Sequence, residues 1–449
     1  MRVAFDPPHE IRDPVHGAIP VDAAELDIID HPVVQRLRGI RQLGFSHLAF
    51  PGATHTRFLH SLGAMHLAGR AFDACFRDDP FPSTARRLAL RRCVRMAALC
   101  HDLGHPPFSH AVEFALPPLD ALALKPENGG GGGRRATHED FTLLLVTASS
   151  LSDAFAASFD FTAAHVAALV SPQVQVEDDF FVESGCDLRG LLSQLISSEL
   201  DVDRLDYLVR DSVFTGARYG EIDTAWLISH LTRHVDADDR VCLALDGRAL
   251  HALDDFMIAR FHMFVMVYFH QKSVAYEEML KRSLATSRPD WTLPADAEAY
   301  ARTDDAWLWD LVRRQDDPWA RRLVGFDPYK VVFEAHGTAE QAALAQRTDL
   351  LERAGIDAIP RTERGVMQRP PKAGAPDLYV VDHPRGGQRQ VLRLHDATRN
   401  FRRDQVTASV SRIYVPPADL ARAREALHAT WQPRPLLFGE LSASDEVLI

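Results

Sequence analysis

The chain has 449 residues, 46% hydrophobic and 25% charged, which is the composition of an ordinary soluble globular protein. The formal net charge of −12 excludes an overall basic field for nucleic acid or an anionic membrane, so a polyanion has to be met by a local arginine cluster. Five cysteines without a CxxC pair, and a start without a signal-peptide pattern, indicate a reduced, cytoplasmic protein. The most apolar run, residues 256–269, is interrupted by Arg260 and His262; it predicts a buried helix and no membrane span.

The first half of the chain reads as mostly helical. Residues 1–25, with turn signals at Pro14 and Gly17, predict loops and a short hairpin. Asp30 is expected to cap a helix that begins near Pro32. Apolar spacing predicts further helices, over 54–76, 84–103 and 190–211.

Two features divide the chain. Five consecutive glycines (129–133) predict a mobile loop, for which an inert surface insertion and an active-site lid are the alternatives. Proline returns around 286–296, where we place a boundary between a helical core (1–285) and a smaller α+β lobe (286–449). In the lobe we expect helices near 298–315 and 418–430 and strands at 331–335, 377–382, 390–395 and 411–416. The predicted fold is therefore mainly α.

The segment His101-Asp102-Leu103-Gly104-His105 and the nearby His110 carry the chemistry. A neutral imidazole beside a carboxylate at a helix end can ligate a divalent metal ion, but two adjacent residues cannot complete a site. The best suppliers of the remaining ligands are His60 and Asp203, which lie on predicted helices. Such a mixed nitrogen and oxygen set suits Fe, Mn, Mg or Zn and leaves positions open for water and substrate.

Several longer segments occur in a fixed order along the chain. They make it resemble the HD-domain deoxynucleoside triphosphate triphosphohydrolases over nearly its whole length. The resemblance implies hydrolysis of a deoxynucleoside triphosphate (dNTP) to deoxynucleoside and triphosphate, a homo-oligomer, and a chain that starts at the catalytic core without a sterile-alpha-motif domain. The segments are DPVHG (13–17), QRLRGIRQLG (35–44), FPGATHTRFLHSLG (50–63), HDLGHPPFSH (101–110), THE (137–139), ELDVDRLDYLVRD (199–211), FHMFVMVYFHQK (261–272), GFDPYKVV (325–332) and SRIYV (411–415).

The resemblance also implies a role for each matching residue. The metal ligands fall on His60, His101, Asp102 and Asp203. The catalytic histidines fall on His105, His110 and His138, with Glu139 supporting His138 and His110 as general acid. The triphosphate clamp falls on Arg57, Arg204, Tyr207 and Arg260. Sugar recognition falls on Gln42 and Asp211, and exclusion of the 2′-hydroxyl on Leu43 and Tyr268.

Helical spacing agrees with these roles. Arg57 and His60 are three residues apart and share a helix face. Asp203, Tyr207 and Asp211 repeat every four residues and line one stripe, for which a solvated acidic face is the alternative interpretation.

The sequence departs from the family pattern at several positions. Arg204 replaces a lysine, Phe264 a nucleotide-contacting histidine, and Gln271 a lysine used in assembly. Asp30, Gln35 and Arg38 match residues that bind an activating guanine nucleotide, with a helix cap and a surface charge as the alternatives. The basic residues of the adjoining regulatory site are Ala225 and Trp226, so we expect activation by a nucleotide to be weakened, altered or absent.

Two other functions compete with this hypothesis. The first keeps the metal but changes the substrate to a nucleoside monophosphate, a cyclic nucleotide or another phosphoester. The second is a catalytically silent protein that senses nucleotides or binds nucleic acid, which the acidic charge and the four intact ligand positions disfavour.

Overall fold

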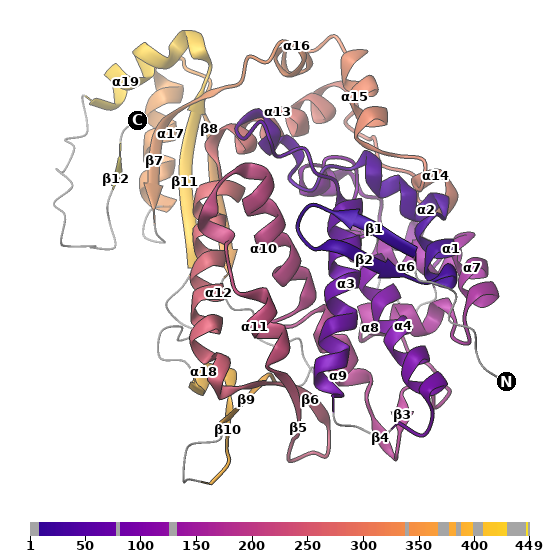
Figure 1. The fold of residues 1–449 in the computed structure, drawn as a ribbon. Helices are drawn as coiled ribbons and strands as arrows, with labels where there is room; N and C mark the ends of the chain where they lie inside the picture. The colour runs from indigo at the N-terminus through magenta and orange to yellow at the C-terminus, as the bar shows by residue number, and fades with distance from the viewer. Residues whose placement is uncertain are drawn as a thin grey trace.

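The computed structural model describes residues 9–77, 81–124, 133–336, 341–366, 377–382, 388–397, 407–428 and 446–447. Helices dominate the chain up to residue 324, and a smaller α+β lobe follows, so the predicted fold class is confirmed (Figure 1). The predicted glycine loop falls largely on 125–132, outside the described residues.

An N-terminal hairpin packs beside the helical core. Strands β1 (His9–Asp13) and β2 (Gly17–Val21) pair in antiparallel register, as the turn signals predict. Helix α1 (Ala23–Ile29) begins at Asp22, whose carboxylate accepts from the Glu25 amide in a capping box. Short helix α2 (Pro32–Gln35) follows and tightens into a 3₁₀ turn over Arg36–Gly39.

The core helices stack around α3 (Arg57–Cys75), which is buried along most of its length. Helix α3 packs against α4 (Thr84–Cys100) and against α10 (Val202–Thr215). The HDLGHPP segment begins directly after α4. The other core helices are α6 (His138–Ala148), α7 (Leu151–Ser158), α8 (Ala163–Val170), α9 (Arg189–Ile196), α11 (Thr224–Ser229), α12 (Leu250–Met263), α13 (Gln271–Ser287), α14 (Ala297–Tyr300), α15 (Asp305–Arg313) and α16 (Pro318–Val324).

Three details of the helix prediction are wrong. The single helix expected over 190–211 is split into α9 and α10, because the Asp201 carboxylate accepts from the amides of Ser198 and Arg204 and starts a new helix. Asp30 does not cap α2: it lies at the C-terminal end of α1, and the His31 ring accepts from the Val33 amide instead. The helix expected near 298–315 likewise begins anew at Asp304, the N-cap of α15.

Within the described residues, one four-stranded sheet joins distant parts of the chain. Its order is β10-β9-β6-β5, with β6 and β9 parallel. The sheet thus combines strands from both sides of residue 286, and the boundary placed there stays a prediction. Its strands are β5 (Leu231–Val235), β6 (Val241–Asp246), β9 (Tyr379–Asp382) and β10 (Gln390–Arg393), and the short helix α18 (Leu394–Ala397) follows β10.

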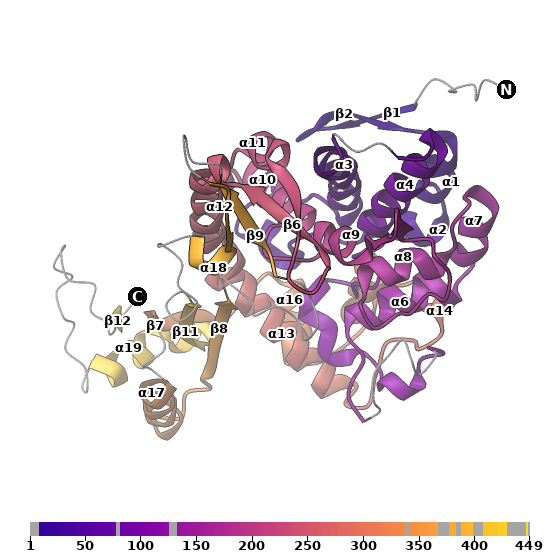
Figure 2. The same ribbon diagram turned by 90° about the horizontal axis from the view of Figure 1, so that it is seen from below.

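A second four-stranded sheet forms the C-terminal lobe, in the order β12-β7-β11-β8. Helices α17 (Gln341–Arg353) and α19 (Leu420–His428) share a core with one face of this sheet, at one side of the molecule in Figure 2. On β11, Ala408 and Val410 instead pack with Phe269 against the π-helical turn that ends α12. The strands are β7 (Lys330–His336), β8 (Ile359–Val366), β11 (Thr407–Val415) and β12 (Glu446–Val447), and the short strands β3 (Val182–Glu183) and β4 (Cys186–Asp187) pair apart from both sheets.

The described helices were compared with the length and apolar composition that a membrane span requires. Among the described residues, no single helix is long and apolar enough to cross a bilayer, and α6 with α7, bent by 55°, meets that test by length and composition only.

Gly104 shows how closely α6 lies against the HDLGHPP segment. A Cβ added to Gly104 would meet the His138 carbonyl oxygen at 2.0 Å and the Thr142 amide nitrogen at 2.2 Å. Because both obstacles are backbone, Gly104→Ala is expected to lower the free energy of unfolding by at least about 2 kcal/mol. Urea unfolding followed by circular dichroism tests this, and a midpoint equal to that of the wild type would contradict it.

Candidate metal centre and active site

Four side chains from three separate segments converge on one point. His60 lies on α3, His101 and Asp102 directly follow α4, and Asp203 lies in the first turn of α10. The ligand atoms of His60, His101 and Asp102 all lie within 4.8 Å of one another. Asp203 Oδ1 lies 3.1 Å from His60 Nε2 and 3.6 Å from His101 Nε2.

The two rings are oriented by hydrogen bonds on their far sides. His60 Nδ1 donates to Asp206 Oδ2 at 2.8 Å, and His101 Nδ1 donates to the Ala98 carbonyl at 2.7 Å. Both Nε2 atoms therefore face the carboxylates, and these far-side bonds are the kind that fix metal-binding histidines. This donor set fits a divalent cation, as the sequence proposes.

The protonation of His60 depends on its carboxylate neighbours. Burial acts to lower the pKa of His60, but hydrogen bonds with Asp203 and Asp206 outweigh it and raise the pKa to about 10. A cation has to displace this proton, so binding is expected to release protons to solvent.

A buried ion-pair network supports His60. Asp206 accepts from His16 Nε2 at 2.6 Å and from Arg210, which also donates to Asp13 at 2.8 Å. Asp206 and Arg210 are fully buried. Sequence reasoning missed these four residues, although DPVHG and the spacing of Asp206 and Arg210 on the helix of Asp203 were the available signals.

Arg57, in the first turn of α3, contacts one of the candidate metal ligands. Its guanidinium pairs with Asp102 and donates through Nε to Ser109 Oγ at 2.9 Å. Ser109 and the preceding Phe108 have positive φ angles of 56° and 57°. Such strain in non-glycine residues is concentrated at functional sites.

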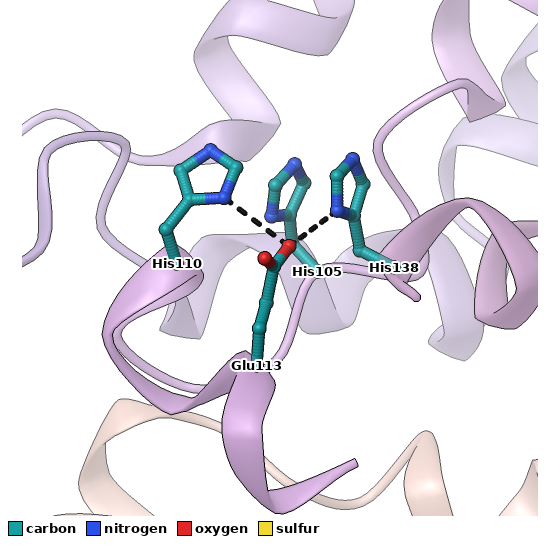
Figure 3. Close-up of side chains that lie close together, drawn as sticks. All are labelled: His105, His110, Glu113 and His138. Atoms are coloured by element: carbon teal, nitrogen blue, oxygen red, sulfur yellow. Dashed lines mark hydrogen bonds and ion pairs between the residues drawn. The ribbon is translucent and has the colours of Figure 1, made fainter. Parts of the chain in front are cut away.

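Three histidines and one glutamate form a second cluster beside the metal ligands (Figure 3). Glu113 lies between His110 and His138 and accepts from the Nδ1 atom of each, at 3.2 Å in the case of His110. The carboxylate against His138 is therefore that of Glu113, which sequence reasoning missed, while Glu139 is exposed on the first turn of α6.

The pKa shifts of Glu113 and His105 indicate which groups in this cluster are charged and which are neutral. Burial acts to raise the pKa of Glu113, but hydrogen bonds from His110 and His138 hold it well below its usual range. Burial, with Arg57 and His138, lowers the pKa of His105, so this ring is neutral. The His105 and His138 rings stack with centroids 4.1 Å apart and planes 15° apart. The ligand atoms of the four residues lie within 4.8 Å of one another, so by geometry this cluster too could hold a metal ion.

The residues proposed as a triphosphate clamp border the metal ligands. Tyr207 lies one turn after Asp203, with its ring 6.5 Å from that of His60. Burial raises the pKa of Tyr207, against the opposing charges of Arg260 and Arg204. Arg204 pairs with Asp201, and Arg260 is buried with its guanidinium 5.6 Å from the Phe264 ring.

The residues proposed for sugar recognition also come together. Asp211 accepts from the Tyr268 hydroxyl at 2.8 Å and from His55 Nε2 at 2.7 Å. The backbone N–H of Gln42 donates to the His55 carbonyl. The side-chain Oε1 of Gln42 is buried and has no hydrogen-bond partner among the described atoms. Leu43 is half-buried against the core. Sequence reasoning missed His55. Because Asp211 is 1% exposed, the alternative of a solvated acidic face on this stripe is wrong.

The proposed regulatory residues lie near one another on the surface. Gln35 donates to the Ile29 carbonyl and accepts from Arg38 Nε at 2.6 Å. Arg38 is exposed and lies over the Phe58 ring, and Asp30 is exposed next to Ile29.

Comparisons with known proteins agree with this geometry. The sequence matches the HD domain over residues 57–158 and the HD associated region over 222–353. An uncharacterized protein of Methanocaldococcus jannaschii is 29% identical over 320 residues, covering 71% of this chain and 58% of that protein. The deoxynucleoside triphosphate triphosphohydrolase of Homo sapiens is 30% identical over 256 residues, covering 54% of this chain and 39% of the human protein. A crystal structure of a hypothetical protein from Aquifex aeolicus superposes with a TM-score of 0.72 at 25% identity, covering 94% of this chain and 100% of the other.

The helical fold and the convergent histidine and aspartate side chains define an HD-type fold with a candidate metal site. The chain therefore contains an HD domain followed by an HD associated region, and it is similar over part of its length to a deoxynucleoside triphosphate triphosphohydrolase.

Asp206 gives a direct test of how the metal ligand is held. Asp206→Asn removes the charge that orients His60, so metal affinity is expected to fall 10- to 100-fold, a typical effect of losing such a partner. Isothermal titration with Mn²⁺ measures this. Asp178→Asn is the matched control, because Asp178 pairs with His165 at 2.9 Å away from the site. Equal affinities in the two variants would contradict the assignment.

Proposed function

We propose that the protein hydrolyses deoxynucleoside triphosphates to deoxynucleoside and inorganic triphosphate. The supporting observation is the single face of α10 that carries Asp203, Tyr207 and Asp211. Four residues of helix advance about 6 Å, so a metal ligand, a phosphate contact and a sugar contact follow one another over about 12 Å. A dNTP presents its phosphates and sugar in the same order.

His60, His101, Asp102 and Asp203 would hold the cation. When bound, a divalent cation supplies Lewis-acid activation of water and charge stabilisation at phosphoryl oxygens. The chain's own contribution is orientation, because Asp206 and the Ala98 carbonyl fix both imidazoles. Arg57, Arg204 and Arg260 supply positive charge to the phosphate chain, which lowers the cost of charge that develops in phosphoryl transfer.

His110 is the proposed proton donor to the leaving 5′-oxygen. Its side chain is 67% exposed, so it is accessible to a substrate. Glu113 accepts from Nδ1, which leaves Nε2 as the atom that donates. His138 shares Glu113, and the neutral His105 ring, stacked on that of His138, would contact the phosphates.

Selection of deoxyribose over ribose would come from the closely packed side chains around Asp211. The hydrogen bond to Asp211 fixes the ring of Tyr268, and the Tyr207 ring lies 6.1 Å away at 73°. A rigid aromatic wall with Leu43 leaves little room for a 2′-hydroxyl. Asp211 and Gln42 provide acceptors for the 3′-hydroxyl.

Regulation and assembly are part of the same proposal. We expect a cytoplasmic homo-oligomer in which Asp30, Gln35 and Arg38 contact an activating nucleotide. Ala225 and Trp226 bring no charge to an adjoining site, so activation should be weakened, altered or absent.

A substrate panel tests the proposed reaction. Purified protein is incubated with dNTPs, NTPs, nucleoside monophosphates and simple phosphoesters in the presence of Mg²⁺, Mn²⁺, Fe²⁺ or Zn²⁺, and products are separated chromatographically. Triphosphate released from dNTPs, abolished by chelation and by Asp102→Ala but not by Asp310→Ala on the surface of α15, is the expected result. Orthophosphate released from monophosphates would replace the substrate assignment with another phosphoester.

The proton donor is tested separately. His110→Ala is expected to lower kcat 10²- to 10⁴-fold with metal affinity unchanged, because general acid catalysis contributes about that factor. Glu113→Gln should lower kcat by less, since it disturbs only the orientation of the ring. Steady-state kinetics with metal titrations measure both, and wild-type turnover in His110→Ala would remove His110 from the mechanism.

A further inference from the structure

A buried carboxylate from the C-terminal half of the chain contacts two segments that border the candidate active site. Asp305 is the first residue of α15, and it is 9% exposed. Its Oδ1 accepts from the Phe108 amide at 2.7 Å, and its Oδ2 accepts from the Arg41 amide at 3.0 Å. One side chain therefore joins two segments that are far apart in the sequence.

Helix α15 does not need this carboxylate in order to begin. The side chain of Asp304 is the N-cap and accepts from the Trp307 amide at 2.8 Å. No described arginine or lysine forms a salt bridge with Asp305, and burial raises its pKa to about 6, so it is still mostly ionised at neutral pH. Burying a carboxylate without a cationic partner costs free energy. A carboxylate at this position is explained by the two amides from which it accepts.

The Phe108 amide lies at the start of a strained turn. It is the first amide after the two prolines of the HDLGHPP segment, which have no N–H to donate. Phe108 and Ser109 both have positive φ angles, a conformation that persists in such residues only where the surrounding structure holds it. The bond to Asp305 therefore supports the turn that leads directly into His110.

The Arg41 amide lies directly before residues 42–43, which are proposed for sugar recognition. Ser109 Oγ donates to the Arg41 carbonyl at 3.1 Å, which adds a second bond between the same two segments. The segments are in close contact, because a Cβ added to Gly44 would lie 3.3 Å from the Phe108 carbonyl oxygen. The position of either segment thus depends on the other.

Aromatic packing joins the same three elements independently of the carboxylate. The rings of Phe45 and Phe108 stack with centroids 4.6 Å apart. Trp309, one turn after Asp305 on α15, has its ring 6.4 Å from that of Phe45 and 6.0 Å from that of Phe108. Residues four apart share a helix face, so one face of α15 contacts both segments.

We propose that Asp305 is a positioning residue that sets the distance between the sugar-recognition residues 42–43 and the turn that carries His110. A substrate held by its sugar has to present its 5′-oxygen to His110, so an error in this distance affects both turnover and the choice of sugar. The proposal rests on the proposed function for the roles of these residues, whereas the contacts of Asp305 stand without it.

Asp305→Asn tests the proposal with little change of shape. Asparagine has one acceptor oxygen, and its NH₂ group would face one of the two amides. We expect kcat for a dNTP to fall about 10- to 100-fold with Mn²⁺ affinity unchanged, because small displacements of reacting groups have effects of this size. The preference for a dNTP over the matching NTP, as a ratio of kcat/KM, should fall about 10-fold as the clash with the 2′-hydroxyl relaxes. A substitution that only lowers stability leaves this ratio unchanged.

Asp317→Asn is the matched control. Asp317 is 6% exposed and accepts from the amides of Trp319 and Ala320 at the start of α16, so the same charge is removed from a similar site. It should retain wild-type kinetics. Asp305→Glu keeps both acceptor oxygens and should recover part of the lost turnover, and thermal melts confirm that each variant is folded. Equal effects of the two asparagine substitutions on kcat and on the dNTP preference would overturn the proposal.

Amide hydrogen exchange gives a measurement that does not depend on the substrate. In Asp305→Asn, exchange in residues 41–44 and 108–110 should be faster than in the wild type and in Asp317→Asn. If the wild type releases no triphosphate from dNTPs, the proposed function fails, and exchange together with turnover of the phosphoester found in the substrate panel decides the role of Asp305. Unchanged exchange in both segments, or wild-type turnover in Asp305→Asn, would contradict that role.

Discussion

The carboxylate of Asp206 is the contact on which fold and site both depend. Its two oxygens are shared among His16, His60 and Arg210, so one buried group joins the N-terminal hairpin region, α3 and α10. The approach of the two helices is so close that a Cβ on Gly63 would lie 1.9 Å from Asp206 Oδ1. Removing one partner from a buried ion pair typically costs about 3–5 kcal/mol, a large part of the roughly 5–15 kcal/mol by which a folded domain is stable. The same group therefore holds the core together and aims the imidazole of His60.

Much of the site could be predicted because its residues lie in short, recognisable segments. Residue type and helical position predict His60, His101, Asp102 and Asp203 as ligands, and the structure brings their side chains together. The supporting residues were harder to find, because the contact of Glu113 with His138, that of Asp206 with His60 and that of His55 with Asp211 join residues far apart in sequence. An aspartate or glutamate of this kind looks in sequence like any surface charge, and only burial distinguishes it.

The errors in the helix prediction have a similar origin. Residues 190–211 have continuous apolar periodicity, but the Asp201 side chain competes for backbone amides and interrupts it. Asp30 resembles an N-cap by type, yet His31 occupies the position directly before Pro32 and its ring accepts the bond instead. In both cases a side-chain hydrogen bond, rather than propensity, decides where a helix begins.

The C-terminal lobe contributes to the candidate active site, because it packs against the residues that form the candidate sugar site. Phe264 and Tyr268 belong to a π-helical turn, a rare conformation found frequently at functional sites. Val410 of β11 packs in the same cluster as Phe264, and a Cβ on Gly365 of β8 would lie 2.8 Å from the Phe264 ring. The sheet of the C-terminal lobe thus packs against the π-helical turn that carries Tyr268 and restricts the position of this residue.

The parallel pairing of β6 with β9 has a consequence for biosynthesis. Strand β6 is buried along nearly its whole length, but one of its edges is paired by residues that follow about 135 positions later. During translation at 5–20 residues per second, that edge stays open for about 7 to 27 seconds after β6 leaves the ribosome. An unpaired apolar edge is a template for association with other chains. Newly made protein should therefore be most vulnerable to aggregation in this interval, and chains truncated before residue 379 should keep the vulnerability permanently.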